Sequence, residues 1–138
     1  EMADLALHLI AKGERGKALK VLQKAEKEIP YYNVPVSYMS GSSDMARAYS
    51  LLGQKAKARQ LYDALWKISL QYANYYMSLS PRYFDMSQGS CKMHFQIMMN
   101  LVNENDRFDR TWANSHAAQL TNLFKRFQSL GGSLQQES

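Results

Sequence analysis

The sequence predicts an all-α fold in which about six helices form antiparallel hairpins that stack side by side. Three observations carry this prediction. Apolar residues recur every three or four positions over most of the chain, which is the period of an amphipathic helix. Only three prolines and seven glycines occur in 138 residues, so long helices can run unbroken. Finally, one arrangement of apolar residues around a glycine occurs twice, which indicates a repeated helical unit.

The first hairpin is predicted over residues 2–29. Leu5 and Leu9 lie on the apolar face of its first helix, which ends at Gly13 because glycine readily adopts the left-handed backbone of a helix terminus. The second helix follows after a very short turn and ends at Pro30, so the two helices are expected to be antiparallel. Its apolar face holds Ala18, Leu22, Ala25 and Ile29, and its solvated face holds Lys17, Lys20, Lys24, Lys27 and Glu28.

The second hairpin, predicted over residues 41–78, follows the spacing of the first. Gly53 interrupts the apolar stripe as Gly13 does, and Ala58 follows Gly53 by five residues, as Ala18 follows Gly13. We expect both glycines to have positive φ or to allow two helices to approach closely. The second helix has no stop signal until about 78–81, which predicts one long helix with the stripe Leu61, Tyr62, Leu65, Ile68, Tyr72, Tyr75, Tyr76 and Leu79.

A third hairpin is predicted over residues 90–130, after a loop at 81–89. Its two helices are expected at about 90–104 and 109–130, and the pair Gly131–Gly132 ends the second one. Their apolar stripes are Met93, Ile97, Met98, Leu101 and Val102 in the first helix, and Trp112, Ala113, Leu120, Leu123, Phe124, Phe127 and Leu130 in the second.

Length and charge limit the number of domains and the kinds of partner that the chain is expected to have. A chain of 138 residues with 46% apolar residues suits one globular domain, expected over 1–132, with a disordered tail over 133–138. The net charge of +5 comes from 17 basic and 12 acidic residues that alternate, whereas nucleic-acid binding needs a denser basic stripe, so no nucleic-acid partner is expected. The longest apolar stretches are only a few residues, so no direct membrane insertion by this segment is expected.

The repeated spacing resembles the tetratricopeptide repeat, whose second half reads glycine, alanine, a large apolar residue, alanine and proline. In the second copy Leu65 replaces the later alanine and Leu70 the proline. The two glycines are also 40 residues apart, from 13 to 53, against about 34 in that family, and neither copy opens with tryptophan. The resemblance implies a short right-handed solenoid, with the last hairpin as its cap. The residues that fit in the first copy are Gly13, Ala18, Leu22, Ala25 and Pro30.

A second resemblance covers nearly the whole chain and is carried by the motifs at 17–22, 28–30, 33–38, 46–49 and 75–81, which read KALKVL, EIP, NVPVSY, ARAY and YYMSLSP. The order of these motifs is similar to the C-terminal soluble region of large bacterial multi-pass membrane proteins with a protein O-mannosyltransferase-like membrane half. This resemblance implies an accessory domain of a longer protein, at the periplasmic face of the inner membrane. No catalytic residue carries over, and a start at Glu rather than Met fits an excised part of a longer chain.

No catalytic or metal site is expected. The three histidines, His8, His94 and His116, are scattered, and only His94 lies close to Cys91. Two ligands do not make a zinc site, and a Cys–His nucleophile pair lacks an evident Asn or Asp to orient it. A buried cysteine beside a buried histidine is the better interpretation, so the chain is predicted to be no enzyme and to need no cofactor.

The predicted binding surface lies on the first helix of the second hairpin. Arg47 and Ser50 are polar there, where the first hairpin has Leu7 and Ile10. A guanidinium on such a surface can hold a peptide carboxylate, so the expected partner is a protein or peptide segment, or another part of the parent chain. The full predicted set is Asp44, Arg47 and Ser50, with Tyr31, Tyr32 and Tyr38 from the loop before this helix.

An alternative function is carbohydrate binding by three tyrosines and one arginine, namely Tyr75, Tyr76, Tyr83 and Arg82. Tyrosine rings stack on sugars and their hydroxyls donate hydrogen bonds. Against this, Tyr75 and Tyr76 follow the period of the apolar stripe, which favours packing in the core. The eight methionines likewise suggest an adaptable interface, but Met93 and Met98 lie on an apolar stripe and are expected to fill the core.

Overall fold

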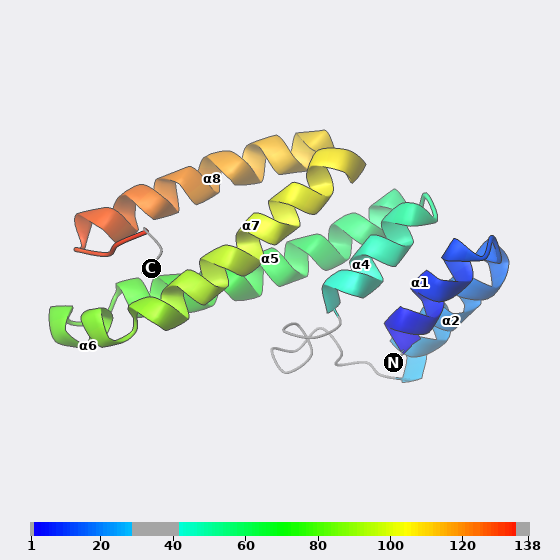
Figure 1. Cartoon of the computed structure of the whole chain (residues 1–138), viewed down its shortest axis with the longest axis horizontal. Helices are drawn as coiled ribbons and strands as arrows, with labels where there is room; N and C mark the ends of the chain where they lie inside the picture. The colour runs from blue at the N-terminus through cyan, green and yellow to red at the C-terminus, as the bar shows by residue number, and fades with distance from the viewer. Residues whose placement is uncertain (1, 29–41, 135–138) are drawn as a thin grey trace. The chain divides into compact units, whose positions relative to one another are not determined.

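The computed structural model describes residues 2–28 and 42–134, and within them the chain forms seven α-helices and no β-strand (Figure 1). The predicted all-α class is therefore confirmed. By their contacts the residues divide into two compact units, unit 1 (Glu1–Leu65) and unit 2 (Trp66–Ser138). The helices are α1 (Met2–Ala11), α2 (Arg15–Glu28), α4 (Ser42–Leu51), α5 (Lys55–Met77), α6 (Pro81–Met86), α7 (Gln88–Phe108) and α8 (Arg110–Ser129).

In unit 1, helix α1 contacts both α2 and α4, and α2 contacts α4. The bounds of the helices are spaced by 40 residues: α1 covers 2–11 and α4 covers 42–51, while α2 starts at 15 and α5 at 55. Small residues are fully or almost fully buried at matching positions, which allows the helices to approach closely. These positions are Ala6 and Ala46 in the first helices, and Ala18 and Ala58 in the second.

The two turns of unit 1 have the same backbone geometry. Gly13 has φ of 82° and Gly53 has φ of 74°, which confirms the predicted positive φ. After α1, the amide of Gly13 donates to Ile10 O and that of Glu14 to Leu9 O, at 3.0 and 2.9 Å. After α4, the matching amides of Gly53 and Gln54 donate to Ser50 and Tyr49 at the same two distances. This pair of bonds is the Schellman motif, which satisfies the last helical carbonyls.

Neither glycine is required by a close approach of helices. A Cβ atom built on Gly13 or Gly53 meets no other atom within 4 Å. Of the two reasons given for these glycines, the backbone conformation is therefore the one that applies. The left-handed region strains any residue that carries a Cβ, even where there is space for it.

In unit 2, helix α7 contacts both α6 and α8. One residue, Asp109, joins α7 to α8: it ends the first helix, and its carboxylate accepts a hydrogen bond from the Trp112 amide at 3.2 Å. The second half of α5 is tied to α8 because Trp66 Nε1 donates to Gln119 Oε1 at 3.1 Å. Four phenylalanines pack edge to face in the core of this unit, namely Phe84, Phe95, Phe124 and Phe127.

The segment 81–89, predicted as a loop, is largely helical. It contains α6 and the start of α7, so the described residues form seven helices rather than about six. Pro81 begins α6, because proline suits the first turn of a helix, where its missing N–H has no partner anyway. Helix α6 is held in place by Phe84, which packs on Phe127 with ring centroids 5.4 Å apart. The helix predicted over 90–104 also extends to Phe108.

Helix α8 ends as predicted, ahead of Gly131 and Gly132. Gly131 has φ of 97°, and the amide of Gly132 donates to Phe127 O at 2.9 Å. A Cβ on Gly132 would overlap the ring of Phe127, which is fully buried, so this glycine is required by close packing. Of the predicted tail at 133–138, residues 135–138 lie outside the described residues.

Candidate functional site

The predicted binding residues on α4 lie along one side of that helix. Arg47 Nη2 and Asp44 Oδ1 form an ion pair of 2.8 Å, with the arginine side chain 40% exposed and the carboxylate 25%. Ser50, one turn further on, is half-buried. Because Asp44 holds one edge of the guanidinium, Arg47 is presented in a defined direction. The other predicted members, Tyr31, Tyr32 and Tyr38, lie outside the described residues.

Helix α1, which contacts α4, carries apolar residues at the positions that correspond to these polar ones. Leu7 and Ile10, which correspond in spacing to Arg47 and Ser50, are both half-buried. Since α1 contacts α4, these side chains belong to the same pair of helices as the arginine. We call this set (Leu7, Ile10, Asp44, Arg47 and Ser50) the α1–α4 surface. It combines partly exposed apolar side chains with one oriented cation.

A polar cluster that the sequence did not reveal connects three helices of unit 1. Lys57 Nζ of α5 lies 2.9 Å from Glu26 Oε1 of α2, and the Glu26 carboxylate also accepts a hydrogen bond from the Tyr49 hydroxyl of α4. Burial, and then the nearby Glu26 charge, raise the pKa of Tyr49 well above its ordinary value. The tyrosine therefore stays protonated, and this cluster suits cross-linking of helices rather than acid–base catalysis.

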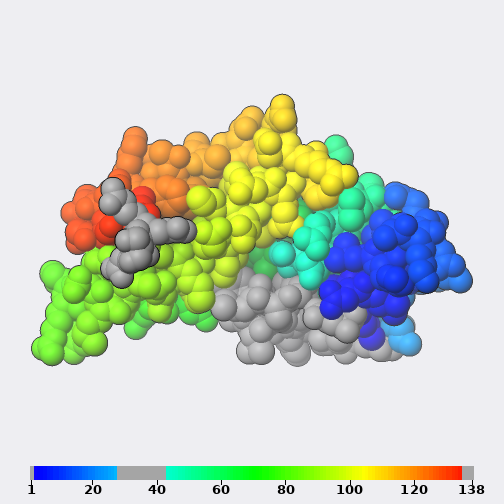
Figure 2. Space-filling model, viewed as in Figure 1, coloured from blue at the N-terminus to red at the C-terminus, as the bar shows by residue number. Residues whose placement is uncertain are grey.

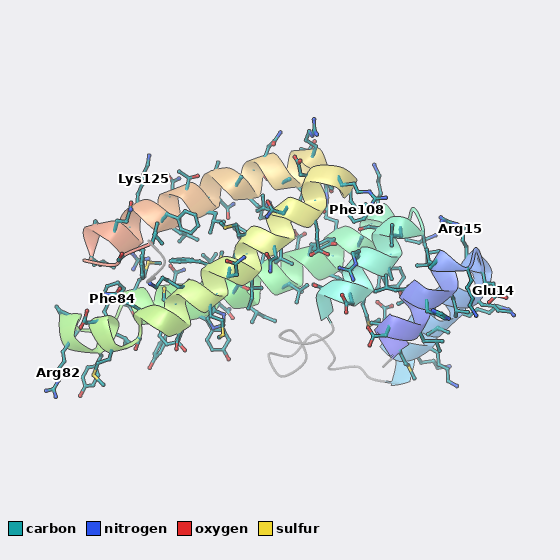
Figure 3. The ribbon with its side chains drawn as sticks, in the orientation of Figure 1. Glu14, Arg15, Arg82, Phe84, Phe108 and Lys125 are labelled. Atoms are coloured by element: carbon teal, nitrogen blue, oxygen red, sulfur yellow. The ribbon has the colours of Figure 1, made fainter. Side chains whose placement is uncertain are left out.

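The four residues of the alternative function are exposed or half-buried. Tyr75 is 59% exposed and Tyr83 is 57% exposed, whereas Tyr76 is half-buried. Tyr75 and Tyr76 contact each other edge to face, with ring centroids 5.4 Å apart. Arg82 is exposed and points away from α6 at its outer end (Figure 3).

The prediction that Tyr75 packs in the core is wrong. In this part of α5 the fully or almost fully buried residues are Ser69, Ala73 and Met77, which are spaced by four. The core side of this part of α5 therefore follows the stripe of Ser69 and Ala73 rather than that of the tyrosines. Tyr75 lies on the other side of the helix, although it is far more hydrophobic than serine.

The pair Cys91 and His94 is buried, as predicted. The His94 ring stacks on Tyr72, with centroids 4.6 Å apart and planes 6° apart, and burial lowers the pKa of its imidazole. Burial also raises the pKa of the Cys91 thiol to about 11, while the Arg126 charge opposes this in part. Because the thiolate is the nucleophile, a thiol with this pKa is inert at neutral pH.

Three further expectations concern metal ligands, membrane insertion and methionines. Within residues 2–28 and 42–134, no three His, Cys, Asp or Glu side chains are grouped so that they could hold a metal ion. In the same ranges, no helix has the length and hydropathy to cross a membrane.

Met98 is fully buried, as expected, but Met93 is 41% exposed, so the core assignment of Met93 is wrong.

The described part of the chain thus presents two candidate binding surfaces, the α1–α4 surface and the exposed tyrosines near α6. Both consist of side chains suited to holding a ligand by contact. Comparison of the chain with protein-family models, curated proteins and solved structures found no match.

Proposed function

We propose that this chain is a non-catalytic scaffold for protein–protein interaction, built on a right-handed stack of tetratricopeptide-like hairpins. The observation that carries the proposal is the contact pattern of unit 1, where α1 contacts both its own hairpin partner α2 and the first helix of the next hairpin, α4. Stacked helical repeats bury their apolar faces through contacts between neighbouring hairpins of this kind. The equal spacing of helix bounds and the matching turns at Gly13 and Gly53 support the same interpretation.

The proposed partner is an extended peptide segment, either of another protein or of a longer parent chain. The α1–α4 surface offers apolar contact from Leu7 and Ile10 and a directed guanidinium from Arg47. Such a combination suits a peptide that carries an apolar side chain near a carboxylate. Following the family resemblance, we propose a bacterial membrane protein as the parent and its other segments as the first partners to test.

The test is a charge reversal on the proposed surface. Arg47→Glu places two carboxylates one turn apart on α4, whereas Lys20→Glu makes the same change of charge on the exposed face of α2. Both purified variants are used to capture partners from a bacterial membrane extract, after circular dichroism has established that they are folded. We expect Arg47→Glu to lose the proteins that the wild type captures and Lys20→Glu to keep them. Equal capture by both variants would contradict the proposal.

A second candidate, carbohydrate binding, is favoured by one observation: Tyr75 and Tyr83 are both more than half exposed. Exposed rings can stack on a sugar, and Arg82, the sequence neighbour of Tyr83, adds a hydrogen-bond donor. Titration of soluble oligosaccharides should then show binding that Tyr75→Ala and Tyr83→Ala abolish and that Tyr75→Phe retains, since phenylalanine keeps the stacking surface. Lack of binding by the wild type would eliminate this candidate without affecting the first.

A further inference from the structure

The most exposed residues of α7 are uncharged over most of its length, and the charged residues Lys92 and Glu104 beside them are half-buried. The exposed residues of this helix from Gly89 to Asn103 are all uncharged, and the first exposed charges are those of Asp106 and Arg107 near its end. Two of the exposed side chains are methionines, Met93 and Met99. Part of this face is visible in the space-filling view as the yellow-green and yellow atoms (Figure 2).

Five of these residues form a straight row, spaced by four, three, four and three positions. This row, which we call the α7 seam, consists of Gly89, Met93, Gln96, Asn100 and Asn103. The spacing keeps them on one side of the helix, in the manner of a coiled-coil seam. With a rise of about 1.5 Å per residue, the seam is about 21 Å long.

A solvated helix in the same chain looks different. On α2 the row with equivalent spacing consists of Lys17, Lys20, Lys24 and Lys27, all exposed. Lysine is depleted from the cores of protein interfaces, whereas methionine is enriched there. The lysine row of α2 is therefore typical of a water-facing surface, whereas the α7 seam is more typical of a contact surface.

The chemistry of the α7 seam is self-complementary. Gln96 Nε2 donates to Asn100 Oδ1 at 3.0 Å, so these amides are already aligned along the helix. A carboxamide both donates and accepts, and therefore can pair with another carboxamide without any charged partner. The chain as a whole carries +5, so two copies repel each other, and this repulsion is smallest when the residues that meet are uncharged.

We propose that the α7 seam binds the α7 seam of a second copy of this chain, the two helices being antiparallel about a two-fold axis. In this arrangement the central residue, Gln96, lies opposite its own counterpart, as a two-fold interface requires. A seam of five residues with four side chains is small, so the dimer is weak and forms at high protein concentration.

The experiment is sedimentation equilibrium over about 10 μM to 1 mM of chain. Wild type should rise from the monomer mass of 15.8 kDa towards twice that value. Gln96→Lys places two like charges across the axis and should raise the dimer dissociation constant by about tenfold or more. The matched control is Gln23→Lys, the same change at an exposed glutamine of α2, which should leave the constant unchanged.

Two further arms separate a direct contact from a general change in the protein. Gln96→Glu mixed with Gln96→Lys should restore association, because the opposed charges then attract. Added salt should strengthen the wild-type dimer by screening its net charge, whereas it would weaken an interface made of ion pairs. A wild type that stays at the monomer mass, equal weakening by Gln96→Lys and Gln23→Lys, or a mixture that does not associate would each overturn the proposal.

Discussion

At the scale of single residues, two glycines near the first turn have opposite roles. Gly13 has positive φ and Gly16 does not, although a Cβ atom meets no obstacle within 4 Å at either position. The cost of a side chain at Gly13 is therefore purely a matter of backbone conformation. At Gly16, in the first turn of α2, a side chain has no such cost and reduces the entropy of the unfolded chain.

We therefore expect Gly13→Ala to lower the free energy of unfolding by about 1–2 kcal/mol. Gly16→Ala should raise it by about 0.5–1 kcal/mol. Urea denaturation followed by circular dichroism measures both values. If the two variants were equally stable, the left-handed turn would not be the reason for glycine at position 13.

The buried imidazole of His94 makes stability depend on pH. Burial lowers its pKa in the folded protein below the ordinary value of 6.5, so the unfolded chain binds a proton more readily than the folded one. Well above pH 6.5 neither state is protonated and this group leaves stability unaffected. As pH falls below 6.5 towards the lowered pKa, this group makes the folded state progressively less stable.

The wild type should lose stability relative to His94→Gln as the pH is lowered from 6.5. The difference should grow by at most about 1.4 kcal/mol per pH unit, the limit for a single proton. Because other groups titrate in both proteins, the difference between their urea midpoints is the quantity to compare. Parallel curves for the two proteins would show that His94 is protonated with equal ease in both states.

At the scale of secondary-structure elements, the polar cluster formed by Glu26, Tyr49 and Lys57 connects α2, α4 and α5. The ion pair between Glu26 and Lys57 is partly buried, with the two side chains 22% and 35% exposed. The pair between Glu14 and Lys17 joins adjacent turns of the chain at a more exposed place. Ion pairs in open solvent contribute little, because water screens them and both side chains lose freedom.

Glu26→Gln should therefore lower the free energy of unfolding by about 1 kcal/mol, since it weakens a partly buried ion pair and a hydrogen bond to Tyr49. Glu14→Gln should change it by less than about 0.5 kcal/mol. Thermal or urea denaturation at neutral pH distinguishes the two. Equal effects would mean that the cluster does not hold the three helices together.

The short helix α6 depends on one anchoring side chain. Phe84 is buried against Phe127, whereas its neighbour Tyr83 is largely exposed. Phe84→Ala leaves a cavity and should cost about 3–5 kcal/mol. Tyr83→Ala should cost less than about 1 kcal/mol. Denaturation of both variants tests the assignment of α6, since in a solvated loop the two substitutions would have similar effects.

At the scale of the whole molecule, the exposed helix rows of the two units differ in residue type. The exposed row of α2 in unit 1 carries lysine, whereas the exposed row of α7 in unit 2 carries amides and methionine. Unit 1 also contains the matching turns and the contacts among α1, α2 and α4 that support a repeat interpretation. The proposed peptide surface and the proposed dimer surface thus belong to different units of the chain.

The sequence by itself determined the helical class and most helix bounds. The apolar period marks where a helix runs, and the glycines at 13, 53 and 131 mark where helices end. Both signals depend only on residues that are close in sequence, so the linear pattern is enough to locate these helices. Helix α6 was missed because proline is compatible with both a loop and the first turn of a helix. Only the packing of Phe84 decides between these two states.

Only the tertiary structure decided which side chains face the core and which groups meet across helices. In the second half of α5, Ser69 and Ala73 are buried and Tyr75 is left at the surface, although tyrosine is more hydrophobic than serine. Glu26 and Lys57 are 31 positions apart, so no local pattern marks them as partners. Burial and pairing depend on which helices come together, and that depends on the shapes of several segments at once rather than on the spacing within one.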